Sequence, residues 1–356
     1  MARTINSDIG SVVFRGELID VSAKFSLSGE QRERNLETVS VLVPSYNHGY
    51  FVARCLRSII TQTHRPLQLI VIDDGSDDDS VRTIERELKA CPFESELVAN
   101  THNGLIPTLN EGLARSRGKY FAYLASDDVW LPEFLASRVK LLGSRTDAVL
   151  AYGHSFVIDE EDRIVECTKD WADYGSGSAR EMLLKVIVPF SPSVLYRRDA
   201  LNQWNEDTEL EDYDLYLRLS SKGEFAFDEG VLCAWRKHSK NNSRRLEFML
   251  RECLQAQRRA VASLGLTPFE LKRAHARLQW LYGSDFVKAG QKSRGLELLC
   301  SSLKGAPSYS SIARMIGALI LPTSISRWRR RHLEEKNVQR YGTLTSTRRA
   351  IGFTDK

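Results

Sequence analysis

From residue 39 to residue 124 the chain alternates short apolar runs with amphipathic segments, about once every dozen residues. The apolar runs are residues 39–43, 67–72, 96–99 and 119–124. Short apolar runs of this kind are typical of parallel strands that are buried on both faces. The segments between them have apolar residues at helical spacing, and they are residues 49–61, 80–90 and 108–117. The alternation therefore predicts βαβ units and an α/β fold with a mainly parallel sheet flanked by helices.

The rest of the chain divides into a mixed middle part and a helical end. Between about 148 and 235 the pattern predicts short strands at 148–152, 193–196 and 231–235 and a helix at 213–222. Helical spacing then dominates residues 246–264, 268–289 and 293–303. One helix-turn-helix within this end resembles a single tetratricopeptide repeat. Because such repeats need neighbours for stability, a helical cap packed on the α/β domain is the favoured alternative.

These patterns predict three segments. Residues 1–37 are an N-terminal extension of unknown role, with weak strand patterns at 12–14 and 18–21. Residues 38–245 form the α/β domain, and residues 246–356 form a helical C-terminal region with a basic amphipathic tail.

Composition excludes several classes of protein. The net charge of the 356 residues is only +4, which gives no reason to expect nucleic acid as a partner. The six cysteines form no Cys-x-x-Cys pair and no Cys/His cluster with zinc spacing, so we expect thiols in a reducing compartment. The sequence shows no signal-peptide pattern and no run of 18 apolar residues. We therefore expect a cytoplasmic location.

Polar side chains follow three of the predicted strands, at the point where each strand ends. Pro-Ser-Tyr-Asn occupies 44–47, Asp-Asp-Gly-Ser occupies 73–76, and Ser-Asp-Asp occupies 126–128. In an open α/β sheet, ligands bind beyond the carboxyl ends of the strands, so these groups should meet at one edge. Carboxylates so close together repel each other unless a cation lies between them. The sequence therefore predicts a site for Mg²⁺ or Mn²⁺ beside substrate phosphates.

Each acidic group has a plainer explanation when it is taken alone. Asp-Asp-Gly-Ser is an ordinary turn sequence, because Asp and Ser side chains bond to nearby backbone amides. Asp127 and Asp128 precede a predicted helix at 132–142 and could serve as its N-cap. The two pairs together at strand ends of one sheet favour the metal site.

Four segments of the chain resemble the family 2 glycosyltransferases, which have the GT-A fold. They are Val-Leu-Val-Pro-Ser-Tyr-Asn at 41–47, Val-Ile-Asp-Asp-Gly-Ser at 71–76, Ser-Asp-Asp at 126–128 and Glu-Asp-Tyr-Asp-Leu at 211–215. Their order and spacing match the family across roughly 38–245. The combination is specific to the fold and to the reaction class, and it does not identify the sugar.

The resemblance implies a role for each matching residue of the donor site. The positions of Pro44, Tyr46 and Asn47 line the nucleotide pocket, where an aromatic ring can stack on any base. The carboxylate of Asp74 accepts a hydrogen bond from the base, which suits UDP-, dTDP- or GDP-linked sugars, while Asp73 supports the turn. In the family's acidic D-x-D element, Asp127 reaches the ribose or sugar and Asp128 contacts the metal. The element here is Ser-Asp-Asp, which departs from a fuller acidic triplet and leaves the exact metal contact open.

The resemblance also implies a catalytic base at Asp212, which would take the proton from an acceptor hydroxyl. Its neighbour Glu211 would lie on the acceptor or diphosphate side. An alternative is that these two acids only favour the start of a helix.

The segment Arg236-Lys-His238, with Asn241 and Ser243, resembles the family's R-x-H-x-x-N-x-S pattern. It implies that Arg236 closes over the diphosphate and that His238 completes the metal shell. A solvated basic loop is the alternative. Asn103, Gly104, Asn110 and Gly112 also match a family stretch, as pocket floor and packing residues. Trp130 either shapes the acceptor side or lies in the core.

An apolar stretch near the C-terminus is followed by an arginine-rich one. Residues 312–321 are apolar, Pro322 ends them, and Ser-Arg-Trp-Arg-Arg-Arg occupies 326–331. Further basic residues follow at Lys336, Arg340, Arg348 and Arg349. This pattern is typical of an interfacial helix on anionic lipid. An amphipathic helix packed on the domain, with a solvated basic face, explains it equally well.

The sequence as a whole predicts an inverting, metal-dependent glycosyltransferase. It would move a sugar from a nucleotide-diphosphate donor to a hydroxyl of a glycan or lipid-linked acceptor, in bacterial surface polysaccharide or glycolipid synthesis. It would work in the cytoplasm, with peripheral contact to the inner face of the cytoplasmic membrane. The alternatives are a sugar-phosphate nucleotidyltransferase, which the lack of a glycine-rich basic loop at 44–49 disfavours, and a non-catalytic glycosyltransferase-like scaffold.

Overall fold

The first four apolar runs form neighbouring parallel strands, as the sequence predicts. Strand β1 (Val39–Ser45) pairs with β2 (Gln68–Asp73) on one side and with β4 (Tyr120–Tyr123) on the other. Strand β3 (Glu94–Ala99) pairs with β2. The order is β3-β2-β1-β4, so the carboxyl ends of these strands meet at one edge.

This computed structural model describes residues 37–175, 177–239, 241 and 244–344. The described residues belong to one unit, which begins at Glu37. The strand patterns at 12–14 and 18–21 lie outside the described residues, as do Ser243, Arg348 and Arg349.

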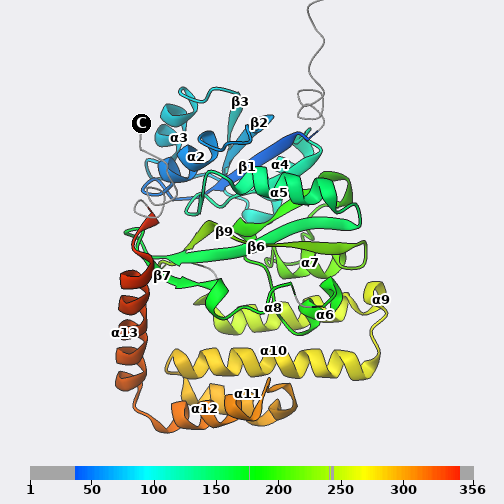
Figure 1. Ribbon diagram of the computed structural model, residues 1–356, viewed down its shortest axis with the longest axis vertical. Coiled ribbons are helices and arrows are strands. Elements are labelled where there is room, and N and C mark those ends of the chain that lie inside the picture. The colour runs from blue at the N-terminus through cyan, green and yellow to red at the C-terminus, as the bar shows by residue number, and fades with distance from the viewer. Residues whose placement is uncertain (1–36, 176, 240, 242–243, 345–356) are drawn as a thin grey trace, which may run out of the picture. The chain divides into compact units, whose positions relative to one another are not determined.

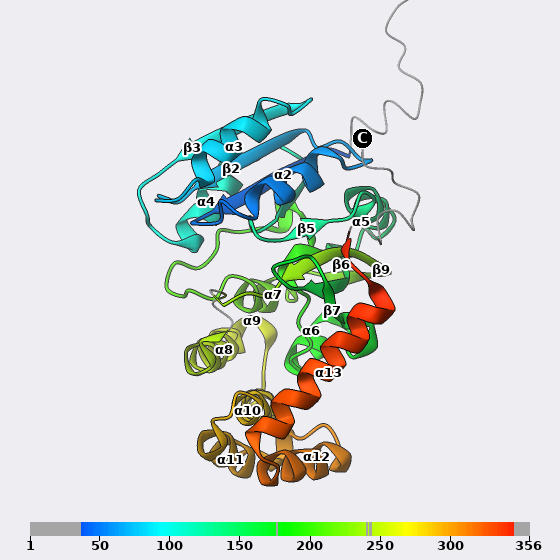
Figure 2. The ribbon, with the colours of Figure 1, turned by 90° about the vertical axis from the view of Figure 1, so that its left-hand side faces the viewer.

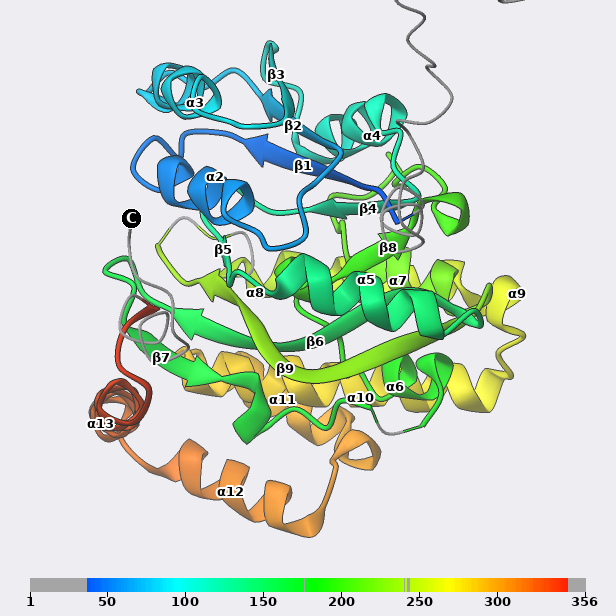
Figure 3. The same cartoon turned by 45° about the horizontal axis from the view of Figure 1, so that its top comes forward.

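The second half of the sheet is mixed, where the sequence predicts a mainly parallel one. Strand β8 (Leu195–Arg197) joins β4 to β6 (Ala148–Ile158), and both pairings are antiparallel. Strand β9 (Glu224–Arg236) runs parallel to β6, and Figure 3 shows the two as long neighbours. The short strands β5 (Val129–Trp130) and β7 (Ile164–Cys167) pair antiparallel with β9 and β6. The predicted α/β class is therefore confirmed, with a mixed sheet.

Three helices share one face of the sheet. Helices α2 (Val52–Ile60) and α3 (Ser80–Leu88) lie on the parallel half, and α5 (Phe134–Ser144) lies on β6, β8 and β9 of the mixed half. Val41 and Val43 pack with them, because alternate residues of a strand point to the same face.

The opposite face carries α4 (Leu105–Arg115), together with α6 (Ala179–Leu184) and α7 (Tyr213–Leu219). Leu42 packs on this side, and a Cβ added at Gly112 of α4 would lie 2.3 Å from its side chain. Gly112 therefore lets α4 approach β1 closely, which confirms the packing role predicted for it.

Helices of the C-terminal region follow one another away from the sheet (Figure 1). Helix α8 (Leu246–Arg259) contacts α7 and α10 (Pro268–Lys288), while α9 (Val261–Leu264) connects the two. Helix α10 in turn contacts α11 (Lys292–Ser301) and α12 (Tyr309–Ile320). The predicted helical cap is confirmed.

The last described helix, α13 (Thr323–Tyr341), returns along the side of the cap to the sheet and contacts β7 (Figure 2). The amide of Asn337 donates to the Val165 carbonyl at 2.8 Å, and the Tyr341 hydroxyl donates to Asp170 at 2.9 Å. Leu344 beyond it is buried beside β5, β6 and β7. Of the helices in the described part of the chain, none has both the length and the apolar character that crossing a bilayer requires.

Candidate active site

The ends of β1 and β2 are held together by a small hydrogen-bond network. Asp73 accepts hydrogen bonds from the backbone N–H and the hydroxyl of Ser76, both at 2.8 Å. The Ser76 hydroxyl accepts from the Asn47 N–H at 2.8 Å, and the Asn47 side chain accepts from the Asp77 N–H at 3.0 Å. Asn47 adopts a positive φ of 54°, a conformation that Asn tolerates better than most residues. Asp73 thus supports the turn, as the sequence predicts.

Asp74 lies beside this turn and is buried. Its carboxylate accepts the backbone N–H groups of Asn103 at 2.7 Å and Gly104 at 2.9 Å. The ring of His102 lies 2.8 Å from the same carboxylate and stacks on Tyr46, with ring centroids 4.2 Å apart. The structure therefore brings Tyr46 and Asp74 together through His102, a residue that the sequence analysis did not single out.

A second group unites three separate segments at the same edge. His48 follows β1, Asp127 follows β4 and His238 follows β9, and ligand atoms of the three lie within 4.8 Å of one another. The His238 Nε2 atom lies 2.8 Å from Asp127 Oδ2, and the His48 Nδ1 atom lies 3.9 Å from Asp127 Oδ1. His48 also meets the Ser126 hydroxyl at 2.8 Å. Two imidazoles and a carboxylate at this spacing can hold a divalent metal ion.

The pKa values of the two neighbouring aspartates, Asp127 and Asp128, are shifted in opposite directions. Burial alone would raise the pKa of Asp127, but the hydrogen bond to His238 and the charges of the two histidines outweigh it and lower that pKa. Burial and the charge of Asp127 raise the pKa of Asp128 well above its usual value. Asp128 also accepts the Arg236 N–H at 2.8 Å. Asp127 is thus the acid of the pair that groups with the two histidines, while the predicted metal contact of Asp128 stays a prediction.

Arg236 is fully buried below this group. Its guanidinium donates to the carbonyls of Asp127 and Asp159, both at 2.7 Å, and pairs with Asp162 at 2.6 Å. It also lies 4.8 Å from the centre of the Phe51 ring. These contacts favour a structural role, and the predicted contact with the diphosphate stays a prediction.

The turn after Arg236 is ordered by Asn241. The Asn241 side chain accepts the His238 N–H at 2.5 Å and donates to the Arg236 carbonyl at 3.1 Å. The ring of Phe51 stacks on His238 at 5.5 Å between centroids. The segment resembling R-x-H-x-x-N is therefore a packed turn that fixes His238, in place of a solvated basic loop.

Glu211 and Asp212 lie at the start of α7. Burial, with the charge of Asp212, raises the pKa of Glu211 to about 8, and burial raises that of Asp212. Asp212 accepts the Tyr213 N–H at 2.5 Å, so it also caps the helix. Both acids lie close enough to the Tyr123 hydroxyl, at the end of β4, that their charges add to burial in raising its pKa. Glu211 and Asp212 therefore lie near the end of β4, the strand that precedes Asp127.

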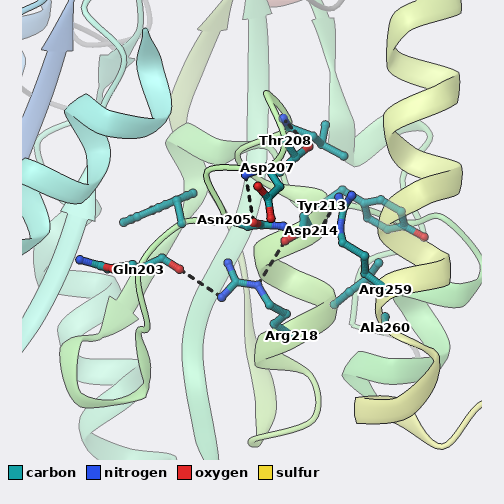
Figure 4. A network of polar contacts seen from close by, with 12 residues as sticks. Gln203, Asn205, Asp207, Thr208, Tyr213, Asp214, Arg218, Arg259 and Ala260 are labelled. Carbon is teal, nitrogen blue, oxygen red and sulfur yellow. Dashed lines mark hydrogen bonds and ion pairs between the residues drawn. The ribbon is translucent and has the colours of Figure 1, made fainter. Parts of the chain in front are cut away.

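Helix α7 is fixed from the side of the C-terminal region (Figure 4). The buried carboxylate of Asp214 pairs with Arg259 of α8 at 2.7 Å and with Arg218 at 3.2 Å. The Tyr213 hydroxyl accepts a hydrogen bond from Gln257 of α8 at 2.8 Å and donates to the Leu183 carbonyl at 3.0 Å. Helix α8 thus sets the position of the helix that begins beside Asp212.

Several sequence-based alternatives are resolved by this geometry. Pro44 is buried in β1 opposite Ile72 of β2. Trp130 is fully buried and donates to the Pro192 carbonyl at 2.7 Å, so it belongs to the core. The side chain of Asn110 donates to the Trp204 carbonyl at 3.1 Å, which is a packing role.

The residues that the sequence analysis missed all carry a ring. His48 directly follows the Pro-Ser-Tyr-Asn segment, and its place just past a strand end was the available signal. His102 lies in a loop, and Phe51 directly precedes helix α2. Patterns in a single sequence do not show which residues such positions contact.

Comparison with known proteins agrees with this architecture. The family model described as glycosyl transferase family 2 matches residues 40–204. An uncharacterized glycosyltransferase of Nostoc sp. is 28% identical over 173 residues, which cover 46% of this chain and 52% of that protein. Chondroitin synthase of Escherichia coli is 25% identical over 247 residues, which cover 67% of this chain and 34% of that protein. The chain thus spans between about a third and a half of the length of these curated relatives.

Solved structures share the fold at low sequence identity. A mannosyltransferase from Pyrobaculum calidifontis, in complex with GDP-Man and Mn²⁺, superposes with a TM-score of 0.55 at 16% identity, covering 85% of this chain and 86% of that chain. Residues 1–349 of S. aureus TarS, in complex with UDP-GlcNAc, give a TM-score of 0.54 at 14% identity, covering 86% and 92%. At these identities the likeness shows the fold. The family model therefore identifies residues 40–204, just under half of this chain, as a family 2 glycosyltransferase domain, and the solved structures agree with it in fold.

Proposed function

We propose that the protein transfers a sugar from a nucleotide-diphosphate donor to an acceptor hydroxyl, with inversion and with the help of a divalent cation. The observation that carries the proposal is the group of His48, Asp127 and His238 at the sheet edge that also holds Asp74 and Tyr46. A cation-binding group next to an aromatic ring and a base-binding carboxylate suits a nucleotide diphosphate.

His48, Asp127 and His238 would hold the cation. Two imidazoles with one carboxylate suit Mn²⁺ better than Mg²⁺, because Mg²⁺ prefers a shell of oxygen ligands. When bound, the cation would offset negative charge on the departing diphosphate. The mannosyltransferase with the same fold is described with GDP-Man and Mn²⁺, which supports this choice.

The donor base would lie against Tyr46, Asn47 and Asp74. One face of Tyr46 already contacts His102, and its side chain is partly exposed, so the ring can still meet a base. Asp74 can accept an imide or amide N–H from uracil, thymine or guanine, which favours UDP-, dTDP- or GDP-linked sugars.

Asp212 would act as the base that takes the proton of the acceptor hydroxyl, and Glu211 would line the acceptor side. The raised pKa of Asp212 supports this role, because a carboxylate with a higher pKa accepts a proton more readily. A single displacement by the acceptor oxygen at the anomeric carbon gives inversion.

For the acceptor we propose a glycan or a lipid-linked sugar, in the synthesis of a bacterial surface polysaccharide or glycolipid. A cytoplasmic location is part of the proposal. All six cysteines are free thiols and four of them are buried, as is usual in a reducing compartment.

The test is nucleotide binding with and without metal. We expect the thermal stability of the protein to rise with UDP, GDP or dTDP plus Mn²⁺. The substitutions His48→Ala and His238→Ala should each weaken the metal-dependent part of the nucleotide affinity at least tenfold. His332→Ala, at an exposed position of α13, is the matched control and should behave as wild type. Equal nucleotide binding with and without Mn²⁺ in the wild type would exclude the proposed metal site. A screen of nucleotide-sugars for hydrolysis and transfer then identifies the donor.

A further inference from the structure

Helix α12 has apolar residues on its inner, packed side and also on an outer side that is exposed to solvent. Its inner side packs Ile312, Met315 and Leu319 against the cluster formed by α10 and α11. Its outer side presents Tyr309, which is 93% exposed, and Ile320, which is 77% exposed. A soluble helix usually has one apolar side, so the outer side calls for a partner.

Helix α13 adds arginines and a second aromatic ring next to this side. Trp328 is 65% exposed, and Arg327 and Arg329 to Arg331 flank it, all with exposed side chains. Among the described residues, the ion pairs between α13 and the rest of the chain involve Glu334 and Arg340, which lie further along the helix. The first half of α13 therefore presents a concentrated positive charge beside apolar side chains.

We propose that this surface rests on an anionic lipid bilayer. We call it the α12–α13 surface, and it consists of Tyr309, Ile316, Ile320, Ile325, Trp328, Arg327, Arg329, Arg330 and Arg331. Exposed isoleucine and tryptophan side chains enter the boundary between head groups and acyl chains, and arginines bind lipid phosphates. A second copy of the chain fits poorly, because an isologous contact would bring the same positive charges together.

The α12–α13 surface is joined to the candidate site by α13 itself. Lys237 Nζ lies 3.2 Å from Glu334 of α13, and His238 is the next residue after Lys237. A cavity of about 730 Å³ lies between the loop of His238 and α13 and is lined by Arg244, Arg331 and Glu334 among others. Binding through α13 would thus fix the orientation of the candidate site relative to the bilayer. The proposal stands whether or not the protein transfers a sugar.

Sedimentation of the full-length protein with lipid vesicles tests the proposal. We expect the protein to sediment with vesicles of phosphatidylcholine and phosphatidylglycerol, to stay in solution with phosphatidylcholine alone, and to bind less tightly as salt is added. The triple variant Arg327→Glu, Arg329→Glu and Arg330→Glu should lose about a hundredfold in vesicle affinity, from about fivefold for each of the three basic residues removed.

Matched variants separate this surface from general charge or apolar effects. Arg82→Glu, Arg86→Glu and Lys89→Glu at exposed positions of α3 and its C-cap change the net charge by the same amount and should leave vesicle binding within a few-fold of wild type. For the apolar part, Ile320→Ser with Trp328→Ser should weaken binding about tenfold or more. The control Phe269→Ser, at a residue that is 74% exposed at the start of α10, should not.

Three results would overturn the proposal. The first is that the wild-type protein does not sediment with anionic vesicles, and the second is that the triple variant of α13 binds them as well as the wild type. The third is a lipid-free dimer that the Ile320 and Trp328 substitutions abolish, because this would assign the surface to a second copy of the chain.

Discussion

The substitution Arg236→Met separates two roles for the same residue. If the buried Arg236 stabilises the fold through its contacts, its loss should lower the free energy of unfolding. If its guanidinium binds the diphosphate, its loss should weaken donor binding and leave stability nearly unchanged.

The contacts of Arg236 give the expected size of the effect. Methionine would fill much of the space but leave the Asp127 carbonyl without its guanidinium donor, at a cost of about 1–3 kcal/mol. The Asp159 carbonyl would lose the guanidinium but keep the Asp162 N–H at 3.3 Å, so we add about 1 kcal/mol for it. Asp162 would lose a buried ion pair and keep its contact with Arg54 at 3.3 Å, so we add only about 1 kcal/mol for it. We therefore expect a loss of about 3–5 kcal/mol in the free energy of unfolding, or a melting temperature lower by about 6–10 °C.

Calorimetry and nucleotide binding on the same samples provide the assay. Arg236→Lys keeps the charge but loses the planar fork of donors, so it should fall between wild type and Arg236→Met. Arg163→Met is the matched control, because Arg163 is exposed and forms surface pairs with Asp159 and Glu161. It should cost less than about 1 kcal/mol. The stabilising role of Arg236 is refuted if Arg236→Met melts within about 2 °C of wild type while its affinity for the nucleotide falls tenfold or more.

Three further predictions concern the acid pair and the packing of α4. Asp212→Asn should abolish transfer and keep nucleotide binding, and unchanged turnover would contradict its role as the base. Glu211 has a pKa raised to about 8 from a usual 4.5, so the folded state holds its proton more tightly than the unfolded state. Stability measured by denaturant unfolding should then fall as the pH rises from about 4.5 to about 8, and Glu211→Gln should flatten this slope; an equal slope in the variant would rule out Glu211 as its source. Gly112→Ala should destabilise the protein by about 1–3 kcal/mol through its clash with Leu42, whereas Gly143→Ala in α5, where a Cβ has open space, should stabilise it by up to about 1 kcal/mol. Thermal melting of the two variants compares them directly.

The first half of the sheet could be predicted because its signals are local. Strands β1, β2 and β4 are short, mainly apolar runs, whereas β3 at the sheet edge is apolar only in its last three residues. Each of the four is followed by a turn or helix signal within a few residues. The mixed half could not be predicted in the same way. Strand β8 is three residues long, and its place between β4 and β6 depends on pairings between residues that are distant in sequence. The 13-residue strand β9 contains Asp228, Glu229 and Gly230, which interrupt the apolar pattern.

The candidate site was predictable as far as it follows strand ends. The positions of Asp74, Asp127 and Tyr46 come directly from the alternation of strands and helices. The partners of those residues do not, because His48, His102 and His238 meet them only after the loops fold. The choice between Asp127 and Asp128 as the residue grouped with the histidines depends on the Arg236 N–H, which takes an oxygen of Asp128.

The anchoring of α7 by α8 has a consequence for how proteins of this kind diverge. The stretch recognised as family 2 ends at residue 204, before Asp212, and the partners of Tyr213 and Asp214 come from Gln257 and Arg259. The half that we propose to bind the nucleotide and the half that we propose to face the acceptor are therefore under separate structural constraints. An exchange of C-terminal helices between relatives could change the acceptor while keeping the donor. The new helices would have to supply a side-chain amide for Tyr213 and a guanidinium for Asp214 of α7, as Gln257 and Arg259 do here.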